Sequence, residues 1–559
     1  MQHRRLAIGL AALAALVLIA VWRRGTWVVK QLLVSNAPAA IAERTGDVYR
    51  VEVHRVRFNA LRRRIAVESI RVTTNEDINA KRQRPLPAVR LTFHDCAITG
   101  IHVFSLITSR GLIAKSFGCR GVSAAAQMPP PSLPGRPLRA APRPGVVVVQ
   151  RGLRLPTFAP RVLLARIDFP HTDLDFRFQW ARGDTARLEL DHLEWHMTDV
   201  TVDPADSAAT SRLLFSRKID ISATSFLAYP DSTTALRVAR FEASLPDSTV
   251  EIRGFAFAPT ISDSAFAQAR PYRRSRLSTT IARIAIRGLD VGAFVLGTGV
   301  RARTVQVDSL RVDVLSDKRR PPNPKRTIRR TPQRWIADLA RSWSVDSVLL
   351  QGSEVTYREH HARRPQPGVL TFARLDASIV NVRHVPGRRS DSPTTLRATA
   401  FVQDEGRLDT EFLVPLDAQT FTMTFRGTLG AMDATSLNTF IHETMPLQFT
   451  KGRIQQVTFD ARVTNGAAQG FVTPRYKDLT IKVTGRGSGG VLGTGGVIGD
   501  AARGIATAVG GAGLHAANPD RGEQAPRRGA INLAFSSTQT LPAFVWGCLR
   551  TGLLAAVRK

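Results

Sequence analysis

The sequences VYRVEVHRVRF, at residues 48–58, and RRRIAVESIRV, at residues 62–72, decide the fold class. Apolar residues recur at every second position, which is the pattern of a β-strand with one buried face. In the second stretch Ile65 and Val67 share one phase, whereas Ile70 and Val72 have the opposite phase. One face of an unbroken strand cannot hold all four, so we expect a bulge or a turn between Val67 and Ile70.

The same pattern returns later in the chain, which indicates an internal duplication. STVEIRGFAF carries Val250, Ile252, Phe255 and Phe257, each at the same offset from its counterpart in the second of these stretches. AITGIHVFSLI, from Ala97, matches AIRGLDVGAFV at a slightly larger offset, and both copies end in a proline-rich segment. Each unit is about 80 residues long, and repetition of this kind extends a sheet by stacking modules.

A third β-rich region follows, with a hairpin predicted where RLDTEFLVPL turns back as TFTMTFRG through Phe421, Met423 and Phe425. Only TPQRWIADLARSW and DATSLNTFIHE have the character of short helices, the second with Asp433 or Thr435 as its N-cap. The fold class that follows is mainly β: an elongated antiparallel sheet of repeated modules, with a few short helices and one N-terminal transmembrane helix.

The predicted organisation runs from an N-terminal flank to a C-terminal apolar helix. Its parts are a flank at 1–5, a transmembrane anchor at 6–22, β repeat unit 1 at 45–127, a Pro-rich linker at 128–145, a β-rich connecting region at 146–229, β repeat unit 2 at 230–316, a basic Pro-rich linker at 317–334, a C-terminal β region at 335–484, and a Gly-rich amphipathic segment, strand and apolar helix at 485–559.

The anchor is predicted from seventeen uncharged apolar residues between two arginine pairs. This length is at the short end of what spans a bilayer core, and the absence of a small-residue cleavage site directly after it favours an uncleaved anchor over a signal peptide. The residues expected in the bilayer are Leu6, Leu10, Leu13, Leu16, Leu18, Val21 and Trp22.

The chain of 559 residues carries a formal charge of +33, from 78 basic and 45 acidic residues. Such a charge favours anionic partners such as lipid headgroups or nucleic acid. The cations are almost all arginines spread from end to end, which is also what a genome-wide codon bias produces. We therefore treat nucleic acid as an unlikely partner and anionic lipid as one that the charge would favour.

Two C-terminal segments need an explanation beyond strands. The glycine-rich stretch at 485–500 lacks the spacing of a phosphate-binding loop and is predicted to continue into a loose amphipathic helix. The tail LPAFVWGCLRTGLLAAV is helical in character, but Arg550 within it argues against a membrane span. We expect an interfacial or groove-plugging helix with Trp546 at the boundary.

The C-terminal third resembles the AsmA-like family of bacterial envelope proteins, with its TamB and YicH relatives. The likeness is carried by FRGTLGAMDATSLNTFI, by KGRIQQVTFDARVTNGAAQGFVTPRYKDLTIKV, by AANPDRG and by the ending RRGAINLAFSSTQTLPAFVWGCLRTGLLAAVRK. It covers residues 420–559 well and residues 45–127 and 230–316 loosely. These motifs are patterns of hydrophobicity and contain no catalytic signature.

This resemblance implies a single-pass protein of the bacterial inner membrane whose body lies in the periplasm. It also implies that the antiparallel sheet is curled and groove-like, with an apolar β-groove similar to that of bridge-like lipid-transfer proteins. Such a groove moves phospholipid between membranes or maintains the outer membrane and envelope. Membrane lipids, through acyl chains and anionic headgroups, and other envelope proteins are the implied partners. The candidate lining residues are Ile65, Val67, Ile70, Val72, Val250, Ile252, Phe255, Phe257, Phe421, Met423 and Phe425. A closed protein core is the alternative for the same side chains.

Catalytic or metal-binding constellations are not predicted, and neither is a cofactor. His94 and Cys96 lie close together in the sequence, but we do not expect the pair to meet as a base and a nucleophile. His360–His361 and His442–Glu443 lack metal-ligand spacing, and Asp173 with Asp175 is interpreted as a solvated strand face. Of the three cysteines, Cys96 and Cys119 are able to pair in an oxidising compartment, although buried free cysteines are the commoner outcome.

Three function classes therefore remain: a lipid carrier or conduit, an envelope scaffold or assembly factor that binds no lipid, and a basic nucleic-acid-binding protein. Enzymatic activity is the least supported class. The identity of the lipid, the direction of transport and the partners are not encoded in any pattern of the sequence.

Overall fold

The computed structural model describes residues 23, 26–27, 31–82, 86–108, 110–127, 160–179, 185–203, 205, 215–269, 272–291, 293, 299–321, 331–337, 342–361, 364–385, 392–445, 447–483, 515–536 and 539–558. The chain divides into two compact units, residues 1–253 and 254–559, which are described one at a time. Strand β9 (Thr249–Pro259) contains the division.

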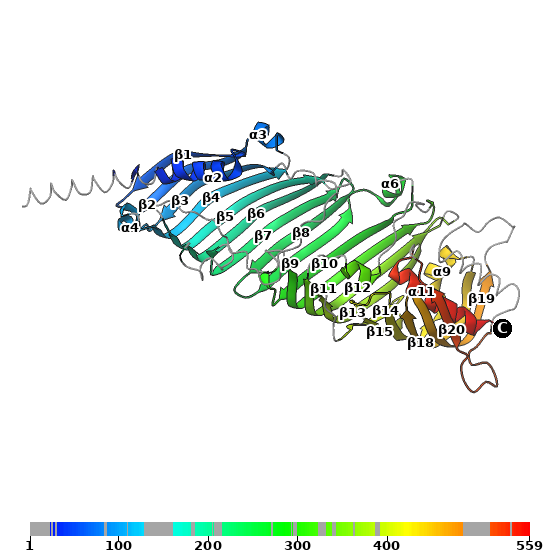
Figure 1. Cartoon of the computed structure of the whole chain (residues 1–559). Helices are drawn as coiled ribbons and strands as arrows, with labels where there is room; N and C mark the ends of the chain where they lie inside the picture. The colour runs from blue at the N-terminus through cyan, green and yellow to red at the C-terminus, as the bar shows by residue number, and fades with distance from the viewer. Residues whose placement is uncertain are drawn as a thin grey trace, which may run out of the picture. The chain divides into compact units, whose positions relative to one another are not determined.

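The first unit begins with two short helical segments and continues as strands. Its elements are η1 (Gln31–Asn36), α2 (Ala37–Thr45), β1 (Tyr49–Asn59), β2 (Arg64–Thr74), α3 (Glu76–Ala80), β3 (Ala88–Thr99), α4 (Val103–Ile107), β4 (Leu112–Gln127), β5 (Val162–Gln179), β6 (Thr185–Val202), β7 (Lys218–Asp231) and β8 (Thr234–Ser244). Strands β1 to β4 pair antiparallel in chain order, β5 lies parallel to β4, and β5 to β8 are again antiparallel. Figure 1 shows these strands side by side, with α2 along β1.

The change of phase in the first stretches is accommodated without a turn. Strand β2 is continuous, and its register to β1 is the same on both sides of Glu68, so no residue is inserted. The neighbouring strands instead carry Arg55 and Asp95 at this level, both with positive φ. A left-handed residue reverses the alternation of side chains, so residues on both sides of it face the same apolar cluster. The predicted bulge or turn in β2 is wrong, and local kinks in the two neighbouring strands take its place.

The second unit is also built mainly of strands, which vary more in length. Its elements after β9 are α6 (Asp263–Gln268), β10 (Ser275–Arg287), β11 (Gly299–Asp317), α8 (Pro332–Ala337), β12 (Ser342–His360), β13 (Gly368–His384), β14 (Thr394–Val402), β15 (Gly406–Val414), β16 (Met423–Leu429), β17 (Met432–Asp433), η3 (Ala434–Leu437), α9 (Asn438–Thr444), β18 (Leu447–Thr464), β19 (Ala467–Val483), β20 (Gly529–Ala534) and α11 (Leu541–Val557). Strands β11 and β12 are parallel, and the other ladders of this unit are antiparallel, with β18 pairing both β16 and β17.

Several local predictions are confirmed. Strands β15 and β16 form the expected hairpin, and both short helices are present. Asp433 caps η3 by accepting a hydrogen bond from the Thr435 backbone N–H at 2.8 Å. The chain is therefore mainly antiparallel β, with repeated strand architecture and few short helices, as predicted.

The two predicted copies share a glycine with the same function in the backbone. Gly100 and Gly288, which occupy equivalent positions in the two copies, have φ values of +65° and +66°. A Cβ at Gly100 would meet the Cβ of Lys115 at 2.5 Å, and one at Gly288 would meet the Cβ of Arg303 at 2.8 Å. Both the backbone conformation and the close approach therefore require glycine.

Hydrogen bonding continues the parallel between the copies. The His102 N–H donates to the Ile113 carbonyl at 2.8 Å, and at the equivalent position of the second copy the Asp290 N–H donates to the Arg301 carbonyl at 2.9 Å. Each copy then continues into a long strand, β4 or β11, whose next neighbour runs parallel. A parallel pair requires a crossover connection, because a tight turn joins only antiparallel strands. The predicted Pro-rich linkers come between these parallel strands in the sequence, but residues 128–145 and 322–330 lie outside the described residues.

Candidate functional site: an apolar row across the first unit

One face of the first unit carries a contiguous apolar cluster that reaches from β1 to β7. Part of it is tightly packed: Ile65, Ile101 and Ile219 are almost fully buried. Aromatic rings hold the centre, with Phe169 lying 5.7 Å from Phe117 and 6.4 Å from Trp195 between ring centroids. This part is a closed hydrophobic core.

Beyond the kink, the same face is only half-buried. The strand register aligns apolar residues of eight strands in one row, which we call the apolar row: Val51, Val72, Leu91, Ala124, Leu174, Leu190, Phe226 and Val238. Most of these side chains retain solvent-accessible surface. Seven steps between strands of about 4.8 Å each give the row a length of roughly 34 Å.

Helices of the first unit leave most of this face uncovered. Among the described residues, α2 packs on β1 and α4 on β4, and no described helix makes comparable contact with β2, β3 or β5 to β7. An apolar sheet face that no other layer covers is unusual in a folded domain, because burial of that face is what stabilises the sheet. The apolar row is thus the part of this unit best suited to a ligand with an apolar surface.

The eleven predicted lining residues separate into two groups. Ile65, Val67, Phe421, Met423 and Phe425 are buried in protein cores, so the expectation that they line a groove is replaced by the closed-core alternative. Val72, Val250, Ile252, Phe255 and Phe257 are half-buried and remain available, whereas Ile70 is half-buried and packs against the core. The other residues of the apolar row were not predicted from the sequence, although the period-two pattern of each strand could have identified them.

The C-terminal tail contributes to the burial of Phe421, Met423 and Phe425. Helix α11 packs on β19 and β20, with Phe544 fully buried 5.6 Å from Phe421 between ring centroids. Cys548 is also fully buried on this face of the helix, and burial raises its thiol pKa to about 12. Trp546 is 38% exposed and Arg550 is half-buried, so the helix lies on the sheet with Trp546 at the solvent boundary. It is a covering layer of the core at this end of the unit.

Charged side chains of β5 and β6 form ion pairs in the first unit. Asp168 contacts Arg166 and the His196 ring at 2.6 Å and 2.7 Å. Burial raises the pKa of Asp168, but the hydrogen bonds from Arg166 and His196 outweigh this effect and hold it below its usual value. Asp175 is bound by Arg187 at 3.1 Å, which lowers the pKa of Asp175.

The residues considered as catalytic candidates from the sequence make structural contacts instead. Cys96 and Cys119 form a disulfide between the adjacent strands β3 and β4, so the weaker of the two alternatives for these cysteines is the one observed. A disulfide-bonded sulfur is not a nucleophile, which removes the His94–Cys96 pair as a catalytic hypothesis. Asp173 accepts a hydrogen bond from the His192 backbone N–H, and Asp175 is paired with Arg187, so both carboxylates have structural partners.

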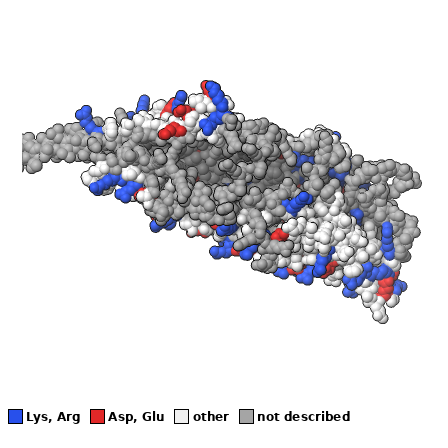
Figure 2. Space-filling model, in the orientation of Figure 1, with Lys and Arg blue, Asp and Glu red and all other residues white. Residues whose placement is uncertain are grey.

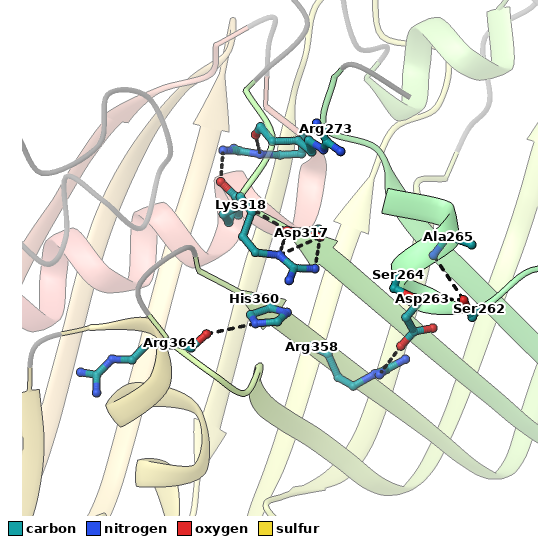
Figure 3. Close-up of polar contacts among 12 residues, drawn as sticks. Ser262, Asp263, Ser264, Ala265, Arg273, Asp317, Lys318, Arg358, His360 and Arg364 are labelled. Carbon is teal, nitrogen blue, oxygen red and sulfur yellow. Dashed lines mark hydrogen bonds and ion pairs between the residues drawn. The ribbon is translucent and has the colours of Figure 1, made fainter. Parts of the chain in front are cut away.

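A polar cluster occurs in the second unit at the ends of β11 and β12, near α6 (Figure 3). Arg358 binds Asp313 through two nitrogens, at 2.6 Å and 2.9 Å, and reaches Asp263 of α6 at 3.1 Å. His360 lies 3.1 Å from the Arg364 carbonyl oxygen (Figure 3). These contacts tie α6 to the strand ends.

Glu359 is the one fully buried acid among the described residues of this cluster. Its carboxylate accepts a hydrogen bond from Tyr357 at 2.6 Å and lies 2.7 Å from His361 and 3.6 Å from Lys318. Burial raises the pKa of Glu359, but His361, Lys318 and Tyr357 together hold it below its ordinary value. Every oxygen of this carboxylate is engaged, so the arrangement is that of a structural ion cluster.

The remaining predicted sites are either not assembled or outside the described residues. Groups of three or more potential metal ligands do not occur in the described part of the chain. The residues expected in the membrane, Leu6 to Trp22, and the glycine-rich stretch at 485–513 lie outside the described residues. None of the helices within the described ranges has both the length and the apolar character of a bilayer span.

Positive charge is dispersed over the face drawn in Figure 2. The described Lys and Arg side chains there lie singly or in small groups, with acidic residues among them. Many arginines are bound to a carboxylate on their own or a neighbouring strand, as in Arg240–Glu242 and Arg253–Glu251. Comparison of the sequence with protein-family models and with curated proteins gives no match.

Proposed function

We propose that this protein is a membrane-anchored protein of the bacterial periplasm that binds phospholipid acyl chains along an apolar β-groove. It would act in phospholipid transport between membranes or in maintenance of the outer membrane and envelope. The observation that carries the proposal is the half-buried apolar row of the first unit, which no described helix covers. The likeness to AsmA-like proteins supplies the cellular setting.

Acyl chains fit the apolar row by chemistry and by length. Each buried CH2 contributes about 0.8 kcal/mol to binding, and the row offers Val, Leu and Phe side chains without an intervening charge. The hydrocarbon core of a bilayer is about 30 Å thick and contains two layers of chains, so a row of roughly 34 Å is longer than one acyl chain. A continuous path of this kind suits a conduit or a carrier better than a single closed pocket.

The disulfide supports the proposed compartment. Cys96–Cys119 is expected to persist in an oxidising environment such as the periplasm and to be reduced in the cytosol. A reporter that is active in only one compartment, fused after Lys559, would locate the body. A cytosolic body would favour the alternative of a nucleic-acid-binding protein.

Native mass spectrometry and lipid extraction test the proposal directly. The full chain, purified in mild detergent, is expected to retain phospholipid, and Ala124→Asp in the apolar row is expected to lose most of it. Ser123→Asp is the matched control, because it places the same charge one residue away on the opposite face of β4. Circular dichroism establishes that both variants fold.

The outcomes separate the remaining function classes. Equal lipid retention by both variants would show that the lipid is bound elsewhere. A folded, lipid-free wild-type protein would refute acyl binding and would favour the envelope scaffold or assembly factor, whose partners crosslinking would capture.

A further inference from the structure

The second unit contains a cavity of about 1140 Å³ that crosses strands β12 to β19. It lies on the face opposite the apolar core beneath α11: Phe425 points into that core, whereas its chain neighbour Arg426 lines the cavity. This cavity is separate from the apolar row, and charged and hydroxyl-bearing side chains line it together with apolar surface of similar extent. We call it the polar groove.

Strand register arranges the floor of the polar groove in two rows. The first row alternates in charge and ends in an aromatic ring: Ser378, Arg397, Glu411, Arg426, Asp460 and Phe471. The second row is built of carboxylates and hydroxyls: Asp376, Thr399, Asp409, Thr428, Thr458 and Thr473. Each strand from β13 to β19, apart from the short β17, contributes one residue to each row.

At β14 and β15 the polar groups satisfy one another. Glu411 binds Arg397 at 2.8 Å and also Arg426, and Thr399 donates to Asp409 at 2.8 Å. The hydrogen bond from Arg397 lowers the pKa of Glu411, so this carboxylate is ionised at neutral pH. This half of the groove is a rigid, charge-balanced floor.

At β16, β18 and β19 the polar groups remain available. The hydroxyls of Thr428, Thr458 and Thr473 lie side by side in register, and within the described residues none has a hydrogen-bond partner. The carboxylate of Asp460 also has no partner among the described residues. Three hydroxyls and one carboxylate therefore face the groove with their hydrogen-bonding capacity unused.

An exposed aromatic ring borders these groups. Phe471 is 47% exposed, and the guanidinium of Arg528 lies 4.5 Å from its ring centroid. An exposed ring beside unused hydroxyls and a carboxylate offers an apolar face on which a ligand is able to pack. Arg528 fixes one side of the ring and supplies further donors at the edge of the groove.

Charge distinguishes the polar groove from the rest of the chain. Its lining holds four carboxylates, on Asp376, Asp409, Glu411 and Asp460, against three guanidinium groups. The whole chain carries +33. A groove with a slight excess of negative charge does not attract a polyanion, whereas an uncharged ligand rich in hydroxyls is able to use both the acceptors and the donors.

We propose that the polar groove binds an uncharged oligosaccharide. A sugar ring presents C–H groups on one face, which pack on the Phe471 ring, and hydroxyls around its edge, which hydrogen-bond Asp460 and the three threonines. The strand rows extend the same contacts to further sugar units. This site is independent of the acyl-binding face, so it stands whether or not the protein transports lipid.

Calorimetric titration of the full chain with chitohexaose, an uncharged hexamer of N-acetylglucosamine, tests the proposal. The detergent must have no sugar headgroup, since such a headgroup would compete. We expect saturable binding with a dissociation constant of about 1 mM or lower. Phe471→Ala and Asp460→Asn are each expected to weaken it at least tenfold without lowering the melting temperature, because both side chains are exposed.

The control variant is Trp335→Ala, which removes an aromatic residue of α8 that is 57% exposed and outside the groove. Its affinity should equal that of the wild type. Cellohexaose, an uncharged glucose hexamer, serves as the second probe. The proposal would be overturned if neither hexamer showed saturable binding, or if Phe471→Ala left the affinity unchanged. Tighter binding of a short DNA duplex at this site would also overturn it.

Discussion

The disulfide between β3 and β4 offers the sharpest test of the first unit. It joins Cys96 to Cys119, which are 23 residues apart and both buried. Closing a loop of this length is expected to stabilise the folded state by about 3 kcal/mol through the lost entropy of the unfolded chain. Reduction, or the double change Cys96→Ala and Cys119→Ala, should therefore lower the free energy of unfolding of this unit by about this amount.

Urea unfolding with and without a reductant measures the difference. Reductant should shift the midpoint of the wild type towards the midpoint of the double variant, and it should not shift the double variant. Cys548→Ala is the control, because this cysteine is free and buried in the second unit and its removal leaves the redox dependence intact. Titration of the denatured, unreduced protein should find one free thiol of the three cysteines. Three free thiols, or equal stability in both conditions, would refute the disulfide and its support for an oxidising compartment.

Three further predictions concern single side chains. Gly100→Ala and Gly288→Ala should each destabilise the protein by at least about 1–2 kcal/mol in thermal unfolding, because positive φ is costly for alanine and the new Cβ meets a neighbouring side chain. Gly121→Ala should be close to neutral in the same assay, because a Cβ at this position has nothing within 4 Å. Phe544→Ala should cost about 3–5 kcal/mol through the cavity left beneath α11, and Trp546→Ala clearly less; equal losses in urea unfolding would contradict the described packing of this helix. Glu359→Gln should lower stability at neutral pH by about 2 kcal/mol. The folded pKa of Glu359 lies below its ordinary value of 4.5, so its contribution to stability is complete above about that pH and is lost as pH falls through the folded pKa. The free energies of unfolding of the wild type and the variant should therefore converge in acid. A difference that stays constant with pH would exclude this carboxylate as the cause.

Strand periodicity predicted much of the fold. Alternation at Val51 and Val53, or at Phe421, Met423 and Phe425, reports which face of a strand is apolar, because that face is set by the backbone alone. The hairpin of β15 and β16 and the Asp433 cap followed from equally local rules. Short-range physics was sufficient for these elements.

Whether an apolar face is covered is a tertiary property, and the sequence did not reveal it. Phe425 and Val72 have the same local pattern, yet α11 buries Phe425, whereas Val72 lies on a face that no described helix covers. The kinks at Arg55 and Asp95 were equally hidden, since positive φ at an arginine or an aspartate has no strong residue signature. The disulfide depended on the register of β3 and β4, which places Cys96 directly opposite Cys119.

The polar groove was missed because the residues of its two rows come from six strands and are adjacent only through register. Arg426, Asp460 and Phe471 are well separated along the chain, but consecutive ladders place them in one row. The apolar row arises in the same way, from one residue of each strand in the first unit. A sheet built by repeated pairing turns a period of two along each strand into continuous rows across the strands. The rows are mostly apolar in one unit and mostly charged or hydroxyl-bearing in the other, and an extended ligand that lies across the strands is what such surfaces are suited to bind.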